Sequence, residues 1–417
     1  MTGRSTGNVE RLQCACCIAG GGPAGMMLGL LLARAGVDVV VLEKHADFLR
    51  DFRGDTIHPS TLNVVAELGL VEEFLSRPHQ EIKELHAYFG GELVPIADFS
   101  QLRTRCRYLV LMPQWDFLDF LASEAVKYPT FRLRMRTEAD GLLVENSRIV
   151  GVRASTPQSS LEVRADLVVA ADGRSSRVRA EARLPVVDLG APIDVLWMRI
   201  SRRADDPETP AGRFDRGRIF VMIYRGDYWQ CGFVIPKGGY DEVRRRGLAA
   251  FRQTIAEIVP FLKDRVGELG DWDAIKLLTV KVDRLKRWHR AGLLCIGDAA
   301  HAMSPVGGVG INLAIQDAVA AANILAKPLR EHRLDSTMLD CVQRRRELPT
   351  RLTQWLQVLV QDRVIGRTLA AREPLRVPLL VRLLRRCRLL RRLPAYLVGV
   401  GVRPEHVRTG DALAERA

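Results

Sequence analysis

A glycine-rich segment near the N-terminus has the residue types and spacing that bind phosphate groups. It fits the pattern G-x-G-x-x-G and consists of Gly20, Gly21, Gly22, Pro23, Ala24 and Gly25. In this pattern the first glycine permits a tight turn, the second lets a pyrophosphate approach the backbone, and the third lets the following helix pack closely. The start of that helix would offer unpaired N–H groups and a positive dipole end. The segment therefore predicts a dinucleotide site.

The flanking residues favour the same site. Residues 12–19 form a continuous apolar run, typical of a buried parallel strand, and residues 23–35 predict a helix with proline in its first turn. Residues 37–44 predict a second strand, which ends with Glu43 and Lys44. Glu43 would accept hydrogen bonds from both ribose hydroxyls of an adenosine, and its charge would repel a 2′-phosphate.

Two further motifs lie far along the chain. Asp172-Gly173 follows the apolar run LVVAA, and such a pair after a strand is by itself usually a turn. Gly297-Asp298 follows LLCI, where a carboxylate could hold the ribityl hydroxyls of a flavin. The glycine-rich residues 305–312 then open a long predicted helix. Its start could lie against the N1–C2=O edge of a flavin ring, where negative charge gathers on reduction.

With these three motifs in order, the chain resembles the FAD-dependent aromatic hydroxylases, the superfamily of p-hydroxybenzoate hydroxylase and the ubiquinone-pathway hydroxylases. The resemblance covers about residues 14–340. It implies that Asp172-Gly173 serves both FAD and NAD(P)H and that Asp298 contacts the ribityl chain. It also implies that Arg53 lies near the flavin and its pyrophosphate. The cofactor-binding residues predicted in this way are Gly20, Gly22, Pro23, Ala24, Gly25, Glu43, Lys44, Arg53, Gln114, Asp172, Gly173, Gly297, Asp298, Pro305, Gly308, Val309, Gly310, Ile311 and Asn312.

The chain departs from the family at one position of the last motif. The family often has Gly-Gln-Gly where this sequence has Gly308-Val309-Gly310. Because backbone N–H groups bind the cofactor there, we expect flavin binding to be retained, whereas a role specific to the glutamine side chain is put in doubt.

The resemblance implies a monooxygenase reaction. NAD(P)H reduces FAD, dioxygen adds to form a flavin C4a-hydroperoxide, and its terminal oxygen passes to an electron-rich carbon of an aromatic or lipophilic small molecule. The protein must keep this intermediate away from water. A phenolic substrate also needs a base or acceptor near its hydroxyl group.

The sequence does not identify that acid/base residue. His58 lies in the loop after Arg53, and His301 follows the Gly297-Asp298 motif, although a structural role suits His301 better. Tyr224 and Tyr228 lie on a predicted hairpin, where aromatic residues mostly pack. These four residues are the weak catalytic candidates.

The order of the predicted elements indicates an α/β protein with a discontinuous Rossmann-type FAD-binding domain and an inserted antiparallel substrate domain. Short strands are predicted around a Gly90-Gly91 turn, helices over 59–76 and 241–263, and arginine-rich helices at the C-terminus. The predicted FAD-binding domain comprises residues 12–80, 106–185 and 285–340; the substrate domain comprises 81–105 and 186–284; the C-terminal basic helical segment comprises 341–417.

Composition limits the function classes. The 417 residues carry a net charge of +13, and much of the excess lies in the last 90 residues. Residues 376–392 hold seven arginines between leucines, which favours either packing on the body or peripheral contact with an anionic membrane. We expect no nucleic acid partner, because no binding fold is visible.

Eight scattered cysteines fit a reducing compartment and form no zinc pattern, so we expect a cytoplasmic monomer or dimer without metal.

Other functions on a flavin scaffold stay open at this point. A reductase or dehydrogenase acting on a lipid or polyprenyl chain is one alternative, and a flavin-dependent halogenase is another. The halogenase pattern W-x-W-x-I-P is met here only in part, because the segment from Trp229 to Pro236 keeps Ile-Pro but lacks the paired tryptophans. A flavin-binding interaction protein without turnover is a third.

Overall fold

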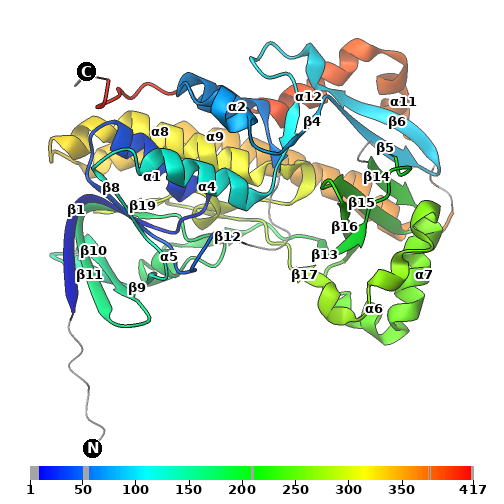
Figure 1. Cartoon of the computed structure of the whole chain (residues 1–417), viewed down its shortest axis with the longest axis horizontal. Helices are drawn as coiled ribbons and strands as arrows, with labels where there is room; N and C mark the ends of the chain where they lie inside the picture. The colour runs from blue at the N-terminus through cyan, green and yellow to red at the C-terminus, as the bar shows by residue number, and fades with distance from the viewer. Residues whose placement is uncertain (1–8, 50–55, 208–210, 374, 376, 415–417) are drawn as a thin grey trace, which may run out of the picture.

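The protein is described by a computed structural model, which is mixed α/β as the sequence predicts (Figure 1). Two large sheets lie side by side, and long helices cover the upper face of the first sheet in this view. The structure describes residues 9–49, 56–207, 211–373, 375 and 377–414.

The first sheet has eight strands, of which five neighbouring ones, β20, β11, β1, β2 and β8, are parallel. The order is β19-β20-β11-β1-β2-β8, and β10 and β9 extend it as an antiparallel hairpin from β11. The predicted strands over 12–19 and 37–44 are confirmed. The strands are β1 (Glu10–Ala19), β2 (Val39–Leu42), β8 (Phe131–Arg134), β9 (Glu138–Glu145), β10 (Arg148–Ser155), β11 (Ser160–Ala170), β19 (His289–Arg290) and β20 (Leu293–Cys295).

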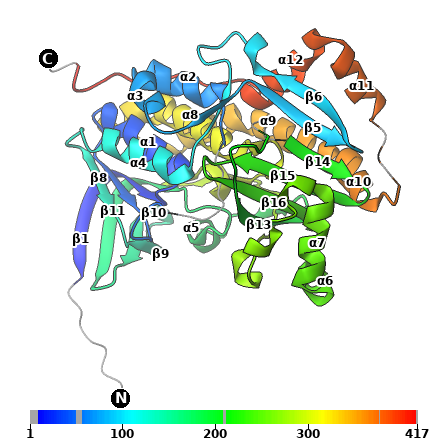
Figure 2. The same ribbon diagram turned by 45° about the vertical axis from the view of Figure 1, so that its right-hand side comes forward.

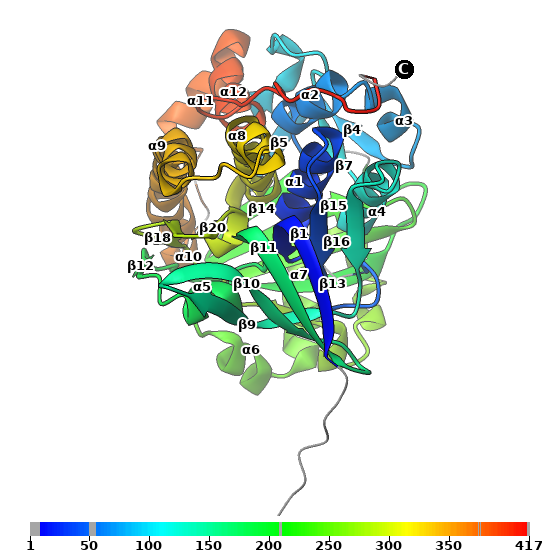
Figure 3. The ribbon, with the colours of Figure 1, turned by 90° about the vertical axis from the view of Figure 1, so that its left-hand side faces the viewer.

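Three helices pack over this sheet: α1 (Pro23–Arg34), α4 (Gln114–Ala125) and α8 (Gly310–Arg330). Figure 3 shows α1 and α8 side by side above β1 and β11. Residues 306–330 are apolar and long enough to cross a membrane, but 78% of the most apolar window is buried inside the protein. The apolar character of α8 therefore reflects its place in the core.

The second sheet has seven strands in the order β17-β13-β16-β15-β14-β5-β6 (Figure 2). All neighbouring pairs are antiparallel except β14 and β5. The predicted hairpin around residues 225–227 is confirmed. The strands are β5 (Glu84–Phe89), β6 (Glu92–Asp98), β13 (Ile193–Ser201), β14 (Ala211–Asp215), β15 (Arg218–Tyr224), β16 (Tyr228–Pro236) and β17 (Lys276–Leu278).

Two small sheets join these parts. One has the order β12-β18-β21 and the other β3-β7-β4. Their strands are β3 (Thr56–Ile57), β4 (Gln80–Ile82), β7 (Leu109–Leu111), β12 (Val186–Asp188), β18 (Asp283–Leu285) and β21 (His301–Ala302). The division of the chain into a FAD-binding and a substrate domain stays a prediction.

Two helices predicted as continuous are divided at glycines. The helix expected over 241–263 consists of α6 (Tyr240–Arg246) and α7 (Leu248–Ile258), because Gly247 between them has φ +87°. The helix expected over 59–76 is likewise divided at Gly69, with φ +77°, into α2 (Pro59–Glu67) and α3 (Val71–Leu75). Such φ values favour glycine and end a right-handed helix.

The C-terminal part is helical, but its basic region is not one helix. After α9 (Ser336–Val360) and α10 (Arg367–Ala370), α11 (Leu379–Arg386) ends at Cys387, whose backbone is extended, and α12 (Arg392–Gly399) follows. Both α11 and α12 contact β6. The final residues then cross α8 to α1, where the N–H of Ala412 donates to the Arg34 carbonyl at 2.8 Å.

Candidate active site

Four neighbouring parallel strands bring the sequence motifs to one edge of the first sheet. The strands β20, β11, β1 and β2 are adjacent, so their carboxyl ends lie next to each other. Gly297-Asp298, Asp172-Gly173, the glycine segment 20–25 and Glu43 follow these four ends in that order. Ligands of open α/β sheets bind outside the carboxyl ends of the strands.

The glycine segment leaves room for a ligand at one position and for none at two others. A Cβ atom on Gly25 would lie 1.9 Å from the carbonyl oxygen of Gly20, and one on Gly20 would lie 2.4 Å from the Ala171 oxygen. At Gly22 a Cβ would meet nothing within 4 Å. Because α1 also lacks a side-chain N-cap, its first N–H groups remain available to an anion such as a pyrophosphate.

Glu43 is oriented by backbone groups beside this turn. Its Oε2 accepts a hydrogen bond from the N–H of Gly21 and its Oε1 accepts one from the N–H of His45, each at 3.0 Å. The carboxylate is thereby fixed at the end of β2, the position at which a dinucleotide site has its ribose-binding acid. Lys44 next to it is exposed.

Asp172 carries a buried acceptor that the protein leaves open. Its Oδ2 accepts the N–H of Val178 at 3.2 Å, while Oδ1 is buried and has no partner in the described part of the chain. Burial raises the pKa of Asp172. An orphaned buried oxygen of this kind is costly unless a ligand pairs with it. Asp298, at the neighbouring strand end, lies 3.6 Å from the guanidinium of Arg174.

Gly297 lies in close contact with both the glycine segment and α8. It has φ +57°, and a Cβ there would lie 3.1 Å from the Cβ of Ala24 in the glycine segment and 3.2 Å from the Cβ of Ala314 in α8. Only a residue without a side chain allows this close approach. The glycine segment, the Gly-Asp motif and the start of α8 therefore form one continuous wall.

Asn312 fixes the start of α8 to the segment at residues 56–61. Its Nδ2 donates to the Thr56 carbonyl at 3.1 Å, and its Oδ1 accepts from the N–H of His58 at 2.8 Å and the hydroxyl of Thr61 at 2.7 Å. We predict a cofactor contact at Asn312 from the sequence, but its side chain is engaged with protein groups. Its side chain therefore positions the loop from Pro305 to Gly310, where Gly307 and Gly308 have positive φ.

His58 is fully buried beside this loop. Its Nδ1 bonds to the Val398 carbonyl of α12 at 2.6 Å, which requires the proton on Nδ1. Nε2 is therefore an acceptor in the neutral ring, and it has no partner among the described residues. A Cβ on Gly308 would lie 3.7 Å from it. Burial lowers the pKa of His58 to about 4, even though the bond to Val398 acts in the opposite direction, so the ring is neutral at pH 7.

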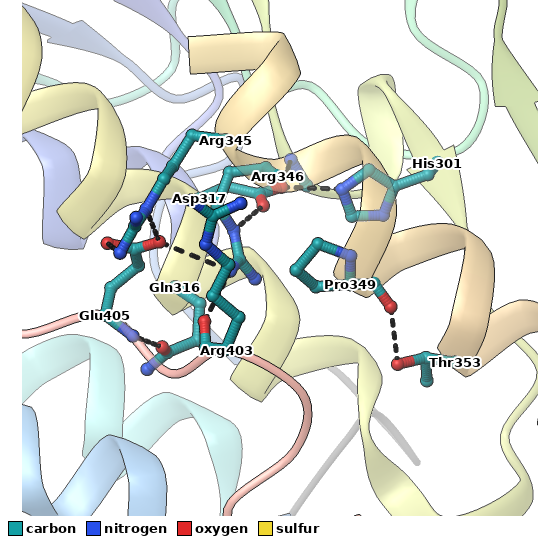
Figure 4. A network of polar contacts seen from close by, with 10 residues as sticks. His301, Gln316, Asp317, Arg345, Arg346, Pro349, Thr353, Arg403 and Glu405 are labelled. Atoms are coloured by element: carbon teal, nitrogen blue, oxygen red, sulfur yellow. Dashed lines mark hydrogen bonds and ion pairs between the residues drawn. The ribbon is translucent and has the colours of Figure 1, made fainter. Parts of the chain in front are cut away.

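His301 belongs to a buried polar network next to the Gly297-Asp298 motif. Its Nε2 lies 2.6 Å from the Oδ2 of Asp317, and its ring packs on Trp288. Asp317 also accepts the N–H of Gly297 at 3.0 Å and the Nε of Arg346 at 3.0 Å (Figure 4). His301 thus helps to hold the Gly297-Asp298 motif in place. It contacts Asp317, and Asp317 accepts a hydrogen bond from the backbone N–H of Gly297.

The network extends to the C-terminal residues. Arg345 makes a bidentate pair with Glu405, and Arg346 lies 3.6 Å from the same carboxylate (Figure 4). Burial raises the pKa of Asp317, but His301 and Arg346 outweigh it and lower the pKa. Sequence reasoning missed Asp317, Arg346 and Glu405. The sequence does contain one signal that indicates this network: Asp317 is an acidic residue within a mostly apolar helix.

The two candidate tyrosines lie away from the loop at the start of α8. Val306 in that loop packs against the apolar cluster that contains Ile193 and Val195, whereas Tyr228 pairs with Ser201 at the other end of β13, six residues after Val195 and thus about 20 Å from it. Tyr224 pairs with Trp229 on the opposite face, against α7. The structure therefore does not bring these tyrosines to the predicted flavin ring.

The sequence also predicts cofactor contacts at Arg53 and Gln114. Arg53 lies outside the described residues. Gln114 is partly exposed at the first position of α4, three residues after β7, the strand that pairs with Thr56 and Ile57. It therefore lies near the segment that Asn312 holds.

The arrangement defines a flavoprotein, and comparison with known proteins places the chain in a family. Residues 13–356 match the family described as FAD binding domain, so the chain belongs to it. The 6-methylpretetramide 4-monooxygenase of Streptomyces rimosus is 35% identical over 90% of this chain and 90% of its own length. A rifampicin monooxygenase of Streptomyces venezuelae is 28% identical over 72% of this chain and 61% of its own length.

Solved structures show the same fold. PqsL, a probable FAD-dependent monooxygenase from Pseudomonas aeruginosa, superposes with a TM-score of 0.73 at 24% identity, covering 86% of this chain and 98% of its own. These findings confirm the predicted fold class and the aromatic-hydroxylase superfamily. The protein is an FAD-dependent monooxygenase. The orphaned oxygen of Asp172 and the open space at Gly22 fit that cofactor.

Proposed function

We propose that this monooxygenase uses NAD(P)H and dioxygen to hydroxylate a polycyclic aromatic or similarly lipophilic small molecule. The main structural observation is that Val306 packs against an apolar cluster that includes one face of the seven-stranded sheet. Val306 lies in the loop that opens α8, and Val195, Ile219 and Val234 are the members of this cluster that lie on the sheet. The flavin end of the cofactor site would therefore face this sheet.

The same face offers apolar side chains for a substrate. Strand register places Trp197, Gly232 and Val221 side by side on it, and Ile223 follows two residues later. A Cβ on Gly232 would lie 3.1 Å from the Trp197 ring, so the indole lies flat against the glycine. Trp197, Val221 and Ile223 are only partly buried. An aromatic substrate would pack on such a surface.

The chain's own residues divide the remaining tasks. The α1 N-terminus and Glu43 would hold the adenosine diphosphate, and Asp298 would hold the ribityl chain. FAD, when bound, supplies hydride acceptance from NAD(P)H and activation of dioxygen. The apolar sheet face would keep water out, and Nε2 of neutral His58 would accept a hydrogen bond at the start of α8.

The similarity to 6-methylpretetramide 4-monooxygenase over nearly the whole chain supports a substrate of a similar chemical class. The test is to incubate the purified holoenzyme with NADH or NADPH and a panel of polycyclic phenols under ¹⁸O₂. We expect a phenol that accelerates nicotinamide oxidation and gains one labelled oxygen atom. Oxidation of substrate without label would favour a dehydrogenase, and chlorination in chloride buffer would favour a halogenase. Either result would contradict the proposal.

A further inference from the structure

Three large apolar side chains form an exposed stripe near the C-terminus. Leu389 is 76% exposed, Leu393 64% and Tyr396 44%. Their spacings of four and three residues place them on one side of the helical turns that lead into α12. We call these three residues the C-terminal stripe.

The opposite side of α12 is apolar as well. Ala395 is fully buried, and a Cβ on Gly399 would lie 3.1 Å from the ring of Phe99, next to β6. A helix that is apolar on both sides is normally buried on both. The C-terminal stripe, however, has no cover in the described part of the chain. Scattered exposed leucines are common, but a periodic group of them indicates a contact surface.

The segment that carries the stripe and the helix before it contain several arginines, and only some of them have carboxylate partners. Arg388 bonds to the buried Asp98 at 2.9 Å and Arg385 pairs with Glu92, so these two fasten the segment to β6. Arg382, Arg386 and Arg392 are exposed, and no carboxylate pairs with them among the described residues. The stripe is therefore bordered by unneutralised positive charge.

We propose that the C-terminal stripe and these three arginines dock the enzyme on an anionic lipid surface. A second copy of the chain is a poor occupant, because its own arginines would repel those around the stripe. Leucine and tyrosine side chains suit the headgroup boundary, and arginines next to them are attracted by anionic lipids. The carbonyl of Val398 in the same helix binds His58, so docking would take place next to the site.

A second exposed stripe, on α9, provides a matched control. Leu348 is 53% exposed, Leu352 41% and Trp355 63%, with the same spacing. Its neighbouring arginines are paired with carboxylates, Arg344 with Asp340 and Arg351 with Glu347. This α9 stripe therefore has similar apolar exposure without free positive charge.

The experiment is co-sedimentation of the holoenzyme with vesicles of phosphatidylcholine containing roughly 30% phosphatidylglycerol, at about 0.1 M salt. We expect binding to these vesicles and little to pure phosphatidylcholine. The double substitution Leu389→Ser and Leu393→Ser should lower the partition coefficient about tenfold, while Leu348→Ser with Leu352→Ser should leave it within about twofold. The FAD content should stay equal in all variants.

A charge series completes the test. Replacing Arg382, Arg386 and Arg392 by Gln should abolish binding, whereas the same change at the exposed Arg244, Arg245 and Arg246 of α6 should not. The proposal fails if the protein does not sediment with anionic vesicles, or if the α9 or α6 variants lose binding equally. It also fails if the unsubstituted protein is a dimer in size-exclusion chromatography and the Leu389 and Leu393 substitutions dissociate it. A further contradicting result would be that a purified acidic carrier protein captures the unsubstituted protein and that the same two substitutions abolish this capture.

Discussion

At the carboxyl edge of the eight-stranded sheet, glycines and backbone groups form the binding surface, whereas the seven-stranded sheet presents side chains. A Cβ on Gly20 or Gly25 would collide with backbone oxygens, so only one residue type fits. On the second sheet, Val195, Trp197 and Val221 could be exchanged for other apolar residues at modest cost. The first region is thus specified for one cofactor, while the second can vary with the substrate.

The two regions also differ in the buried polar clusters that stabilise them. Below the first region lies the buried network of His301, Asp317 and Arg346. The second region has a smaller ionic cluster, in which Arg265 makes two 2.7 Å bonds with Asp206, and the indole N–H of Trp229 donates to the same carboxylate at 2.8 Å. The following substitutions test the contribution of each cluster to stability and the contribution of each region to function.

The largest effect is expected at the buried network. Arg346→Met would leave the buried Asp317 carboxylate without its arginine partner, and breaking a buried pair costs about 3–5 kcal/mol of unfolding free energy. Urea denaturation measures this loss. The matched control is Arg344→Met on the same helix, whose side chain is 79% exposed and whose pair with Asp340 should contribute under about 1 kcal/mol. Equal effects of the two substitutions would refute the structural role of the network.

The next effect concerns the cofactor alone. Gly22→Ala places a methyl group in the open space at the α1 N-terminus, so FAD affinity should fall roughly a hundredfold through lost N–H bonds to phosphate. Flavin absorbance after dialysis measures retention. Gly270→Ala, also in open space but near the second sheet, should keep its FAD. If the Gly22 variant retains stoichiometric FAD, the pyrophosphate is not bound there.

Acid denaturation should reveal the contribution of the ionic cluster in the second region. Burial would raise the pKa of Asp206, but Arg265 and Trp229 outweigh it and lower the pKa to about 2 from 3.8. A depressed pKa stabilises the fold above the ordinary value, and this contribution of about 2 kcal/mol is lost as the pH falls from about 4 to 2. Asp206→Asn should lose less stability over that range in acid denaturation. An unchanged pH profile would show that the pair does not stabilise the fold.

The smallest effect is expected on the substrate face. Gly232→Ala would push the Trp197 ring, which lies 3.1 Å from the new Cβ, at a cost of about 1 kcal/mol. We expect an increased KM for the aromatic substrate and more uncoupled peroxide, with FAD content unchanged. Steady-state kinetics with peroxide detection measures both. A lowered FAD content instead would show that this face does not act independently of the cofactor edge.

Much of the cofactor edge could be predicted from the sequence because its determinants are local. A strand ending in glycines before a helix, as at residues 12–25, has one structural solution. The sequence predicts continuous helices through Gly69 and Gly247, because the spacing of apolar residues does not reveal a single residue with a left-handed backbone conformation. The roles of His301 and Tyr224 depend on which residues each side chain packs against in the folded protein. The local sequence pattern does not reveal those neighbours.

The amino-acid sequence by itself determined the α/β class, the flavin cofactor and the residues at the strand ends, because these depend on backbone conformation within short segments. Only the tertiary structure decided that Asp317, Arg346 and Glu405 meet beneath the Gly-Asp motif. It also decided that Val398 orients His58 across 340 residues of chain. Such contacts join distant segments, and their geometry follows from the packing of whole helices rather than from any local pattern.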